Sequence, residues 1–91
     1  MRKHDFVIAY DIADTKRLPK VAKCLEKYAF RLQKSVFFYP KASRNDIKVL
    51  AKLLKEIIDE TEDDIRIYTV DVGKSIALNK GIELHKINLA L

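Results

Sequence analysis

Two aspartates follow the most apolar run in the first part of the chain. Phe6 to Tyr10 is continuously apolar, and Asp11 and Asp14 come directly after it. A carboxylate at the end of a buried strand lies at a sheet edge, where a cation can reach it. Mg²⁺ prefers oxygen ligands and keeps several waters, so one or two carboxylates plus a substrate phosphate can hold it. Asp11 is therefore the candidate catalytic and metal-binding residue, because a bound cation can polarise a phosphodiester and activate water.

Both aspartates also have structural interpretations. Asp14 suits a helix N-cap or a turn, and Asp11 suits a turn or an ion pair. One aspartate is too few for a tight metal site. A two-fold axis near the first strand would bring two Asp11 side chains together, since each copy supplies the same residue. The hypothesis of a metal site at Asp11 therefore also predicts a homodimer.

A basic segment follows the carboxylates. Four of its lysines are spaced for one face of a helix: Lys16, Lys20, Lys23 and Lys27. A phosphate backbone would explain this stripe, and a solvated helix face would explain it equally well. The donor fork of arginine suits phosphate, with surface ion pairing as the alternative. The candidate nucleic-acid contacts are Lys16, Arg17, Lys20 and Arg31.

The other reactive side chains form no recognisable motif. Ser35 has no histidine or second base nearby in sequence, which argues against a nucleophilic serine. His4 and His85 are too few and too far apart for a metal motif. Cys24 is the single cysteine, which excludes an internal disulfide, and its helical context predicts packing.

Hydrophobic periodicity predicts the elements that carry these residues. A strand is expected over residues 5–12, followed by an amphipathic helix that ends near Tyr28. Pro19 lacks an amide hydrogen and belongs in the first turn of that helix. The apolar stripe of the helix is Leu18, Val21, Ala22, Leu25, Tyr28 and Ala29.

The second half of the pattern repeats this order. Residues 30–39 alternate and stop at Pro40, which predicts one bent strand or two short ones. Ser43 then suits the N-cap of a second helix, with an acidic residue three positions later. A β-branched segment predicts a strand over residues 65–72, and the alternating tail from Gly81 is compatible with a further short strand.

This order is that of an α+β, ferredoxin-like βαββαβ sandwich with an extra C-terminal strand and two helices on one face of an antiparallel sheet. Residues 1–91 are expected to form one domain, with 73–91 as its C-terminal tail. The other sheet face still needs cover. Phe37 and Tyr39 are predicted to point there, where a second subunit would bury them.

Composition limits the class of protein. The 91 residues are 48% hydrophobic and 34% charged, which is typical of a globular chain. No segment resembles a signal peptide or approaches the length of a membrane span, so a cytoplasmic protein is expected. Residues 1–55 hold 14 lysines and arginines against 5 acids, whereas residues 56–64 hold 6 acids and no base. This uneven charge favours a face that binds a polyanion, or simply a soluble charged surface.

The stretch VIAYDIADTKRLPKVAKCLEKYAFRLQKSVF resembles the CRISPR-associated endoribonuclease family, the small dimeric partner of the integrase that captures new spacers. DDIRIY, at residues 63–68, is similar to a later strand of the family, and the resemblance spans residues 5–72. The family pattern is matched at Tyr10, Asp11, Arg31, Gln33, Ser35, Val36 and Phe37.

The resemblance implies a ferredoxin-like homodimer in which Asp11 of each chain faces its mate. It implies Mg²⁺-dependent phosphodiester hydrolysis in members that cleave RNA or duplex DNA, and a C-terminal strand that adds to the partner's sheet. The leading hypothesis is thus a metal-dependent endonuclease of CRISPR adaptation. The alternatives are a non-catalytic dimeric scaffold that bridges integrase subunits on duplex DNA, and a toxin-type ribonuclease or plain interaction module.

Overall fold

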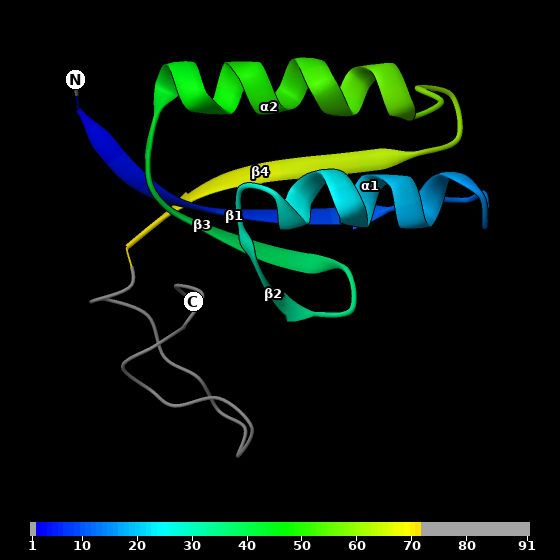
Figure 1. Cartoon of the computed structure of the whole chain (residues 1–91), viewed down its shortest axis with the longest axis horizontal. Helices are drawn as coiled ribbons and strands as arrows, with labels where there is room; N and C mark the ends of the chain where they lie inside the picture. The colour runs from blue at the N-terminus through cyan, green and yellow to red at the C-terminus, as the bar shows by residue number, and fades with distance from the viewer. Residues whose placement is uncertain (1, 72–91) are drawn as a thin grey trace.

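The computed structural model describes residues 2–71. Its sheet is antiparallel, with strand order β2-β3-β1-β4, and both helices lie over one of its faces (Figure 1). The predicted ferredoxin-like α+β architecture is therefore confirmed. The elements are β1 (Lys3–Asp11), α1 (Arg17–Glu26), β2 (Phe30–Gln33), β3 (Val36–Ser43), α2 (Arg44–Ile57) and β4 (Asp64–Val70). The predicted C-terminal strand lies outside the described residues.

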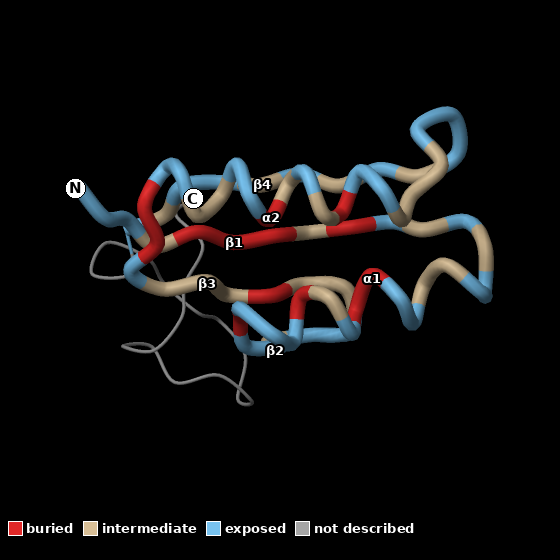
Figure 2. Tube along the Cα trace, turned by 45° about the horizontal axis from the view of Figure 1, so that its top comes forward, coloured by how far each residue is buried: buried red, intermediate tan, exposed pale blue. Residues whose placement is uncertain are grey.

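The core lies between the helices and the two central strands. Ile8 and Tyr10 of β1 and the fully buried Phe37 of β3 form it with residues of both helices. Figure 2 shows this burial concentrated along β1 and on the inner sides of α1 and α2. Four apolar side chains complete the cluster from the helices: Val21, Leu25, Leu50 and Leu54.

The prediction that Phe37 and Tyr39 face away from the helices is wrong. Phe37 pairs with Ile8, and Tyr39 pairs with Phe6. Directly opposed residues of an antiparallel pair share a face, so both aromatics lie on the helix side, packed in or against the core. Phe30 and Phe38 share a face, as the alternation predicts, but Gln33 pairs with Val36 after a register shift, and sequence alone does not show which face is covered.

The opposite face of the sheet has no helix over it within the described residues, and we call it the open face. Val7, Ala9 and Asp11 alternate with the core residues of β1 and therefore point there. Their neighbours on this face include Phe38 of β3 and Tyr68 of β4. Large apolar side chains thus lie on both sheet faces, which a solitary two-layer domain would not require.

Helix α1 begins at Arg17, one residue before its apolar stripe, and ends at Glu26, before the stripe does. Lys16 is its N-cap and makes no side-chain capping bond, so Asp14 is not the cap. Pro19 is the third helical residue, which confirms its predicted place in the first turn. The helix ends at Glu26 rather than Tyr28, and the Tyr28 ring stacks 6.3 Å from that of Tyr39.

Cys24 of the same helix packs against the core, as predicted. Burial raises the pKa of its thiol, which keeps it protonated. Cys24 therefore behaves as a small apolar residue.

Ser43 caps α2 as predicted. Its hydroxyl accepts a hydrogen bond from the Asp46 amide at 3.0 Å, and the Ser43 amide donates to the Asp46 carboxylate at 2.8 Å. This reciprocal capping box satisfies two amides that the helix leaves unpaired, and its hydrogen bonds lower the pKa of Asp46.

The predicted end of the strand at Pro40 is wrong, because β3 continues to Ser43. The β1–β3 register shifts at this point, where Pro40 and Lys41 together lie opposite Asp5. Lys41 takes a positive φ of 51°, and its amide donates to the Asp5 carboxylate at 2.9 Å. A bulge accommodates a proline inside a strand, since it removes the need for a ladder hydrogen bond there.

Candidate functional site

Asp11 is the last residue of β1, and its side chain is exposed on the open face. Its cross-strand partner is Asp64, the first residue of β4. Asp64 accepts a hydrogen bond from Arg66 Nε at 2.9 Å, so its charge is neutralised locally. Within residues 2–71, the Asp11 carboxylate has no hydrogen bond or ion pair. No side chain of this described range therefore occupies its oxygens.

The donor set around Asp11 decides which metals it could hold. No group of three or more His, Cys, Asp or Glu side chains with metal-binding geometry occurs among the described residues. A dedicated cage of protein ligands is thus absent from this part of one chain. A hard cation that keeps most of its waters fits the Asp11 carboxylate, especially if a second carboxylate is supplied by another copy.

The loop that follows Asp11 is held by the buried carboxylate of Asp63. The Ala13 amide donates to it at 2.9 Å, and the Asp59 amide donates at 2.9 Å. Arg17 Nε adds a third bond at 2.8 Å, and the Asp63 side chain has 0% exposure. These bonds lower the pKa of Asp63 well below its usual value, chiefly through Arg17. Asp63 therefore ties the β1–α1 loop to the α2–β4 loop, at the end of the sheet that carries Asp11 (Figure 1).

Arg17 has the ion-pairing role that was the alternative to phosphate binding. Besides Asp63, its guanidinium lies 3.2 Å from the Glu62 carboxylate and 3.6 Å from that of Asp14. These carboxylates raise the pKa of Arg17 and hold the side chain in place. Its donor fork is consequently used inside the chain rather than presented to a ligand.

Sequence reasoning missed Asp63. The available signal was an acidic run at residues 56–64 facing a basic segment far away in the chain. Nothing in the sequence distinguished Asp63 from its acidic neighbours, because its burial depends on how two loops meet.

The lysines of the basic segment are free of such pairing. Within residues 2–71, no ion pair or hydrogen bond holds the ammonium group of any of them, and all are exposed. They are Lys16, Lys20, Lys23 and Lys27. This is the geometry that a phosphate-binding stripe requires, although a solvated face would look the same.

Arg31 lies apart from Asp11. It pairs with Phe37 across β2 and β3, and its guanidinium sits over the Phe37 ring at 5.1 Å. A carboxylate oxygen of Glu26 is 3.8 Å away. Arg31 therefore belongs to the helix side of the sheet, whereas Asp11 projects from the open face. The structure does not bring these two candidates into one site.

Fold and site together define a small ferredoxin-like protein with an acidic residue at the end of its first strand. The family described as CRISPR associated protein Cas2 matches residues 4–75. This chain belongs to the Cas2 family. No helix in the described range 2–71 is long and apolar enough to cross a bilayer.

Two relatives illustrate the sequence similarity. The chain is 42% identical over 67 residues to "CRISPR-associated endoribonuclease Cas2 1" of Nitrosomonas europaea, which covers 70% of this chain and 60% of that protein. It is 33% identical over 85 residues to "CRISPR-associated endoribonuclease Cas2 1" of Thermodesulfovibrio yellowstonii, which covers 91% of this chain and 88% of that one.

Solved structures share the fold. A hypothetical protein, TT1823, from Thermus thermophilus superposes with a TM-score of 0.77 at 29% identity, covering 86% of this chain and 92% of the other. Streptococcus pyogenes Cas2 superposes with a TM-score of 0.66 at 32% identity, covering 74% of this chain and 86% of the other. A chain of a partial Cas6-RT-Cas1–Cas2 complex superposes with a TM-score of 0.67 at 29% identity, covering 77% of this chain and 75% of the other.

Proposed function

We propose that this protein is a homodimeric, Mg²⁺-dependent endonuclease of CRISPR adaptation that hydrolyses phosphodiester bonds in RNA or duplex DNA and acts with the integrase. The observation that carries this proposal is the exposed Asp11 carboxylate, which has no partner within the described residues and ends the central strand. Relatives named as endoribonucleases support the nuclease class. The similarity to a chain of a Cas1–Cas2 complex supports the integrase partner.

A homodimer follows from the apolar character of the open face. Phe30 is 65% exposed and Tyr68 is 50% exposed, and Phe30 pairs with Phe38 on the same side of the sheet. Burying such aromatics against a second copy contributes about 25 cal/mol for each Å² removed from water. Asp11 lies on this same face. A two-fold axis near the end of β1 would therefore place two Asp11 side chains opposite each other.

In this proposal, residues of the chain bind the metal ion and orient the nucleic-acid strand. When bound, Mg²⁺ would neutralise charge at the scissile phosphate and lower the pKa of a coordinated water. The two Asp11 carboxylates would hold the ion, and Asp63 would fix the backbone that follows Asp11. Lys16 and Lys20 would contact the sugar-phosphate strand beside the site.

A nuclease assay on single-stranded RNA and duplex DNA, with and without Mg²⁺, tests the enzymatic part. Asp11→Asn is expected to lower the metal-dependent rate by roughly 100-fold or more, because the carboxylate charge is lost. Glu56→Gln removes an exposed carboxylate from α2 and is the matched control, expected to cleave like the parent protein. Equal metal-dependent cleavage by parent and Asp11→Asn would refute the assigned site.

The second candidate is a non-catalytic scaffold that grips duplex DNA and bridges integrase subunits. The exposed lysines in and beside α1, which have no ion pair within residues 2–71, favour it, since counterion release requires only cations. Salt-dependent duplex binding that is unchanged in Asp11→Asn, in a protein that cleaves neither nucleic acid, would select this function.

A further inference from the structure

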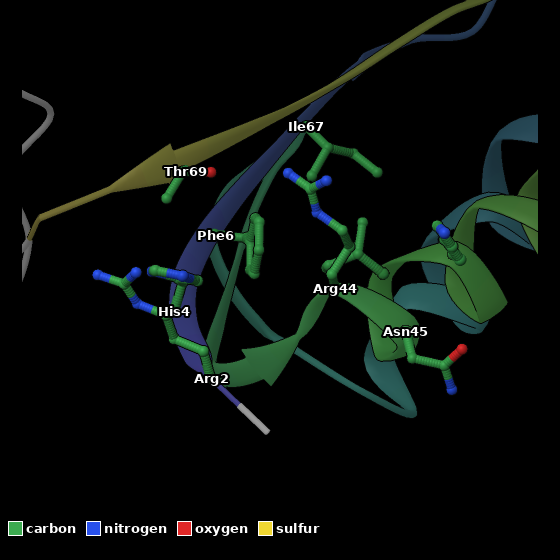
Figure 3. Close-up of a pocket in the computed structure, with 9 residues that line it drawn as sticks. Arg2, His4, Phe6, Arg44, Asn45, Ile67 and Thr69 are labelled. Carbon is green, nitrogen blue, oxygen red and sulfur yellow. The ribbon is translucent and has the colours of Figure 1, made fainter.

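A basic pocket lies at the other end of β1, on the helix side of the sheet. Phe6, the lining residue of β1 nearest to Asp11 along the strand, is five residues away from it, or roughly 17 Å at about 3.3 Å per residue. Its volume is about 750 Å³, within the range of small-molecule sites. The first turn of α2 forms one wall, and β1 and β4 form the other (Figure 3). It is therefore separate from the site described above.

Alternation along the chain explains the wall formed by β1. Arg2, His4 and Phe6 occupy every second position, so they point to the same side. Phe6 is buried, and its ring meets that of His4 edge-on, with centroids 6.4 Å apart. Ile47 and Ile67 continue the apolar surface around Phe6. The pocket thus has an apolar floor with polar groups at its rim.

Its charges have one sign. Arg2, Arg44 and Lys48 line the pocket, and no aspartate or glutamate is among its described lining residues. Within residues 2–71 none of these three cations makes an ion pair, whereas Arg17 and Arg66 are both paired with carboxylates. Figure 3 shows the Arg44 side chain rising from α2 toward the side of the pocket where Phe6 and Ile67 lie.

Helix α2 adds to this field. Arg44 and Asn45 are the first two residues of a 14-residue helix, whose N-terminus carries the positive end of its dipole. The Ser43 hydroxyl is engaged with Asp46 and does not occupy the pocket. The Asp46 carboxylate accepts the Ser43 amide and offsets part of this dipole, so the attraction for an anion comes chiefly from Arg2, Arg44 and Lys48.

We infer that this pocket binds a nucleotide, with the phosphate between Arg44, Lys48 and the start of α2 and the base against Phe6 and its apolar neighbours. An inorganic anion would use only the cations, whereas a nucleotide also covers the apolar floor. The ligand chemistry is shared by a free mononucleotide and by the 5′-phosphorylated end of a nucleic-acid strand. This site does not depend on the endonuclease activity proposed above.

Amide chemical shifts of the full chain, titrated with adenosine 5′-monophosphate, inorganic phosphate and a 5′-phosphorylated trinucleotide, test the inference. The pocket amides, including those of Arg44 and Thr69, are expected to shift saturably with at least one of the two nucleotide probes, and that probe is expected to bind more tightly than phosphate. Saturation by the monophosphate identifies the free nucleotide as a ligand. Saturation by the trinucleotide alone identifies a strand end.

Matched variants locate the site. Arg44→Gln is expected to weaken binding of the saturating probe by about tenfold, the loss of a charge-assisted hydrogen bond. Lys52→Gln removes an exposed lysine of α2 outside the pocket and is expected to leave affinity unchanged. Asp11→Asn is also expected to bind normally, so failure of the nuclease proposal would not affect this result. No saturable shift with either nucleotide probe, or equal binding by the Arg44 and Lys52 variants, would overturn the inference.

Discussion

Arg17 Nε lies 2.8 Å from Asp63 Oδ2, a contact that joins residues 46 positions apart in the chain. The pair fastens the start of α1 to the loop before β4. The same carboxylate also holds the Ala13 amide, two residues after Asp11. A structural ion pair therefore supports the candidate site without taking part in it.

Asp63→Asn should lower the melting temperature by several degrees, because the amide replaces a buried charge that accepts bonds from Arg17 and two backbone amides. Glu62→Gln is the matched control, since Glu62 is 57% exposed and also contacts Arg17. Glu62→Gln should lower the melting temperature far less, because exposed ion pairs contribute little to stability. Thermal unfolding followed by circular dichroism compares the two variants. An equal loss of melting temperature would contradict the proposed role of the Asp63 carboxylate in joining the two loops.

The same pair predicts acid sensitivity. The pKa of Asp63 is lower in the folded chain than in the unfolded chain, chiefly because of Arg17. Its contribution to stability is therefore present above the usual aspartate pKa and is lost as pH falls through the lower, folded value. Denaturant unfolding between pH 5 and about 2 should show a steeper decline for the parent protein than for Asp63→Ala. Parallel curves would rule out this source of acid sensitivity.

Neighbouring aromatics should separate folding from association. Phe37→Ala is expected to cost about 3–5 kcal/mol, since Phe37 is fully buried under the helices. Phe30→Ala should leave the fold intact and weaken the dimer, because Phe30 is 65% exposed on the open face. Urea unfolding and analytical ultracentrifugation measure the two effects. A Phe30→Ala protein that dimerises like the parent would remove this residue from the interface.

The N-cap of α2 offers a local test. Ser43→Ala removes the acceptor for the Asp46 amide and is expected to cost about 1 kcal/mol. Ser43→Asp restores an acceptor and should recover most of that loss. Chemical denaturation of the three proteins checks this, and no difference between Ser43 and alanine would contradict the capping box.

Local sequence signals were sufficient for much of this fold. The apolar run before Asp11, the position of Pro19 and the Ser43 cap each depend on residues close together in the chain, and all were predicted. The sheet face to which Phe37 points was predicted wrongly. It depends on which strands become neighbours, and no local pattern determines that. The sequence of residues 30–40 predicts a strand end at Pro40, because it does not contain Asp5, the residue of another strand that the bulge needs.

The same distinction between local signals and contacts of distant segments applies to the candidate site. Asp11 was found because a carboxylate after an apolar strand is a local signal. Asp63 was missed, and phosphate binding and ion pairing both stayed open for Arg17, because the pairing of these two residues joins loops that are distant in the sequence. Arg31 was predicted to contact nucleic acid because its donor fork suits phosphate, and no local pattern shows that the sheet places it on the face opposite Asp11.

The number of divalent ions bound per chain tests the central claim most directly. Titration with Mn²⁺, followed by electron paramagnetic resonance, is expected to show one site for every two chains if paired Asp11 carboxylates share an ion. That site should vanish in Asp11→Asn while the dimer persists. One ion per chain, or a site that survives in Asp11→Asn, would contradict a shared carboxylate site.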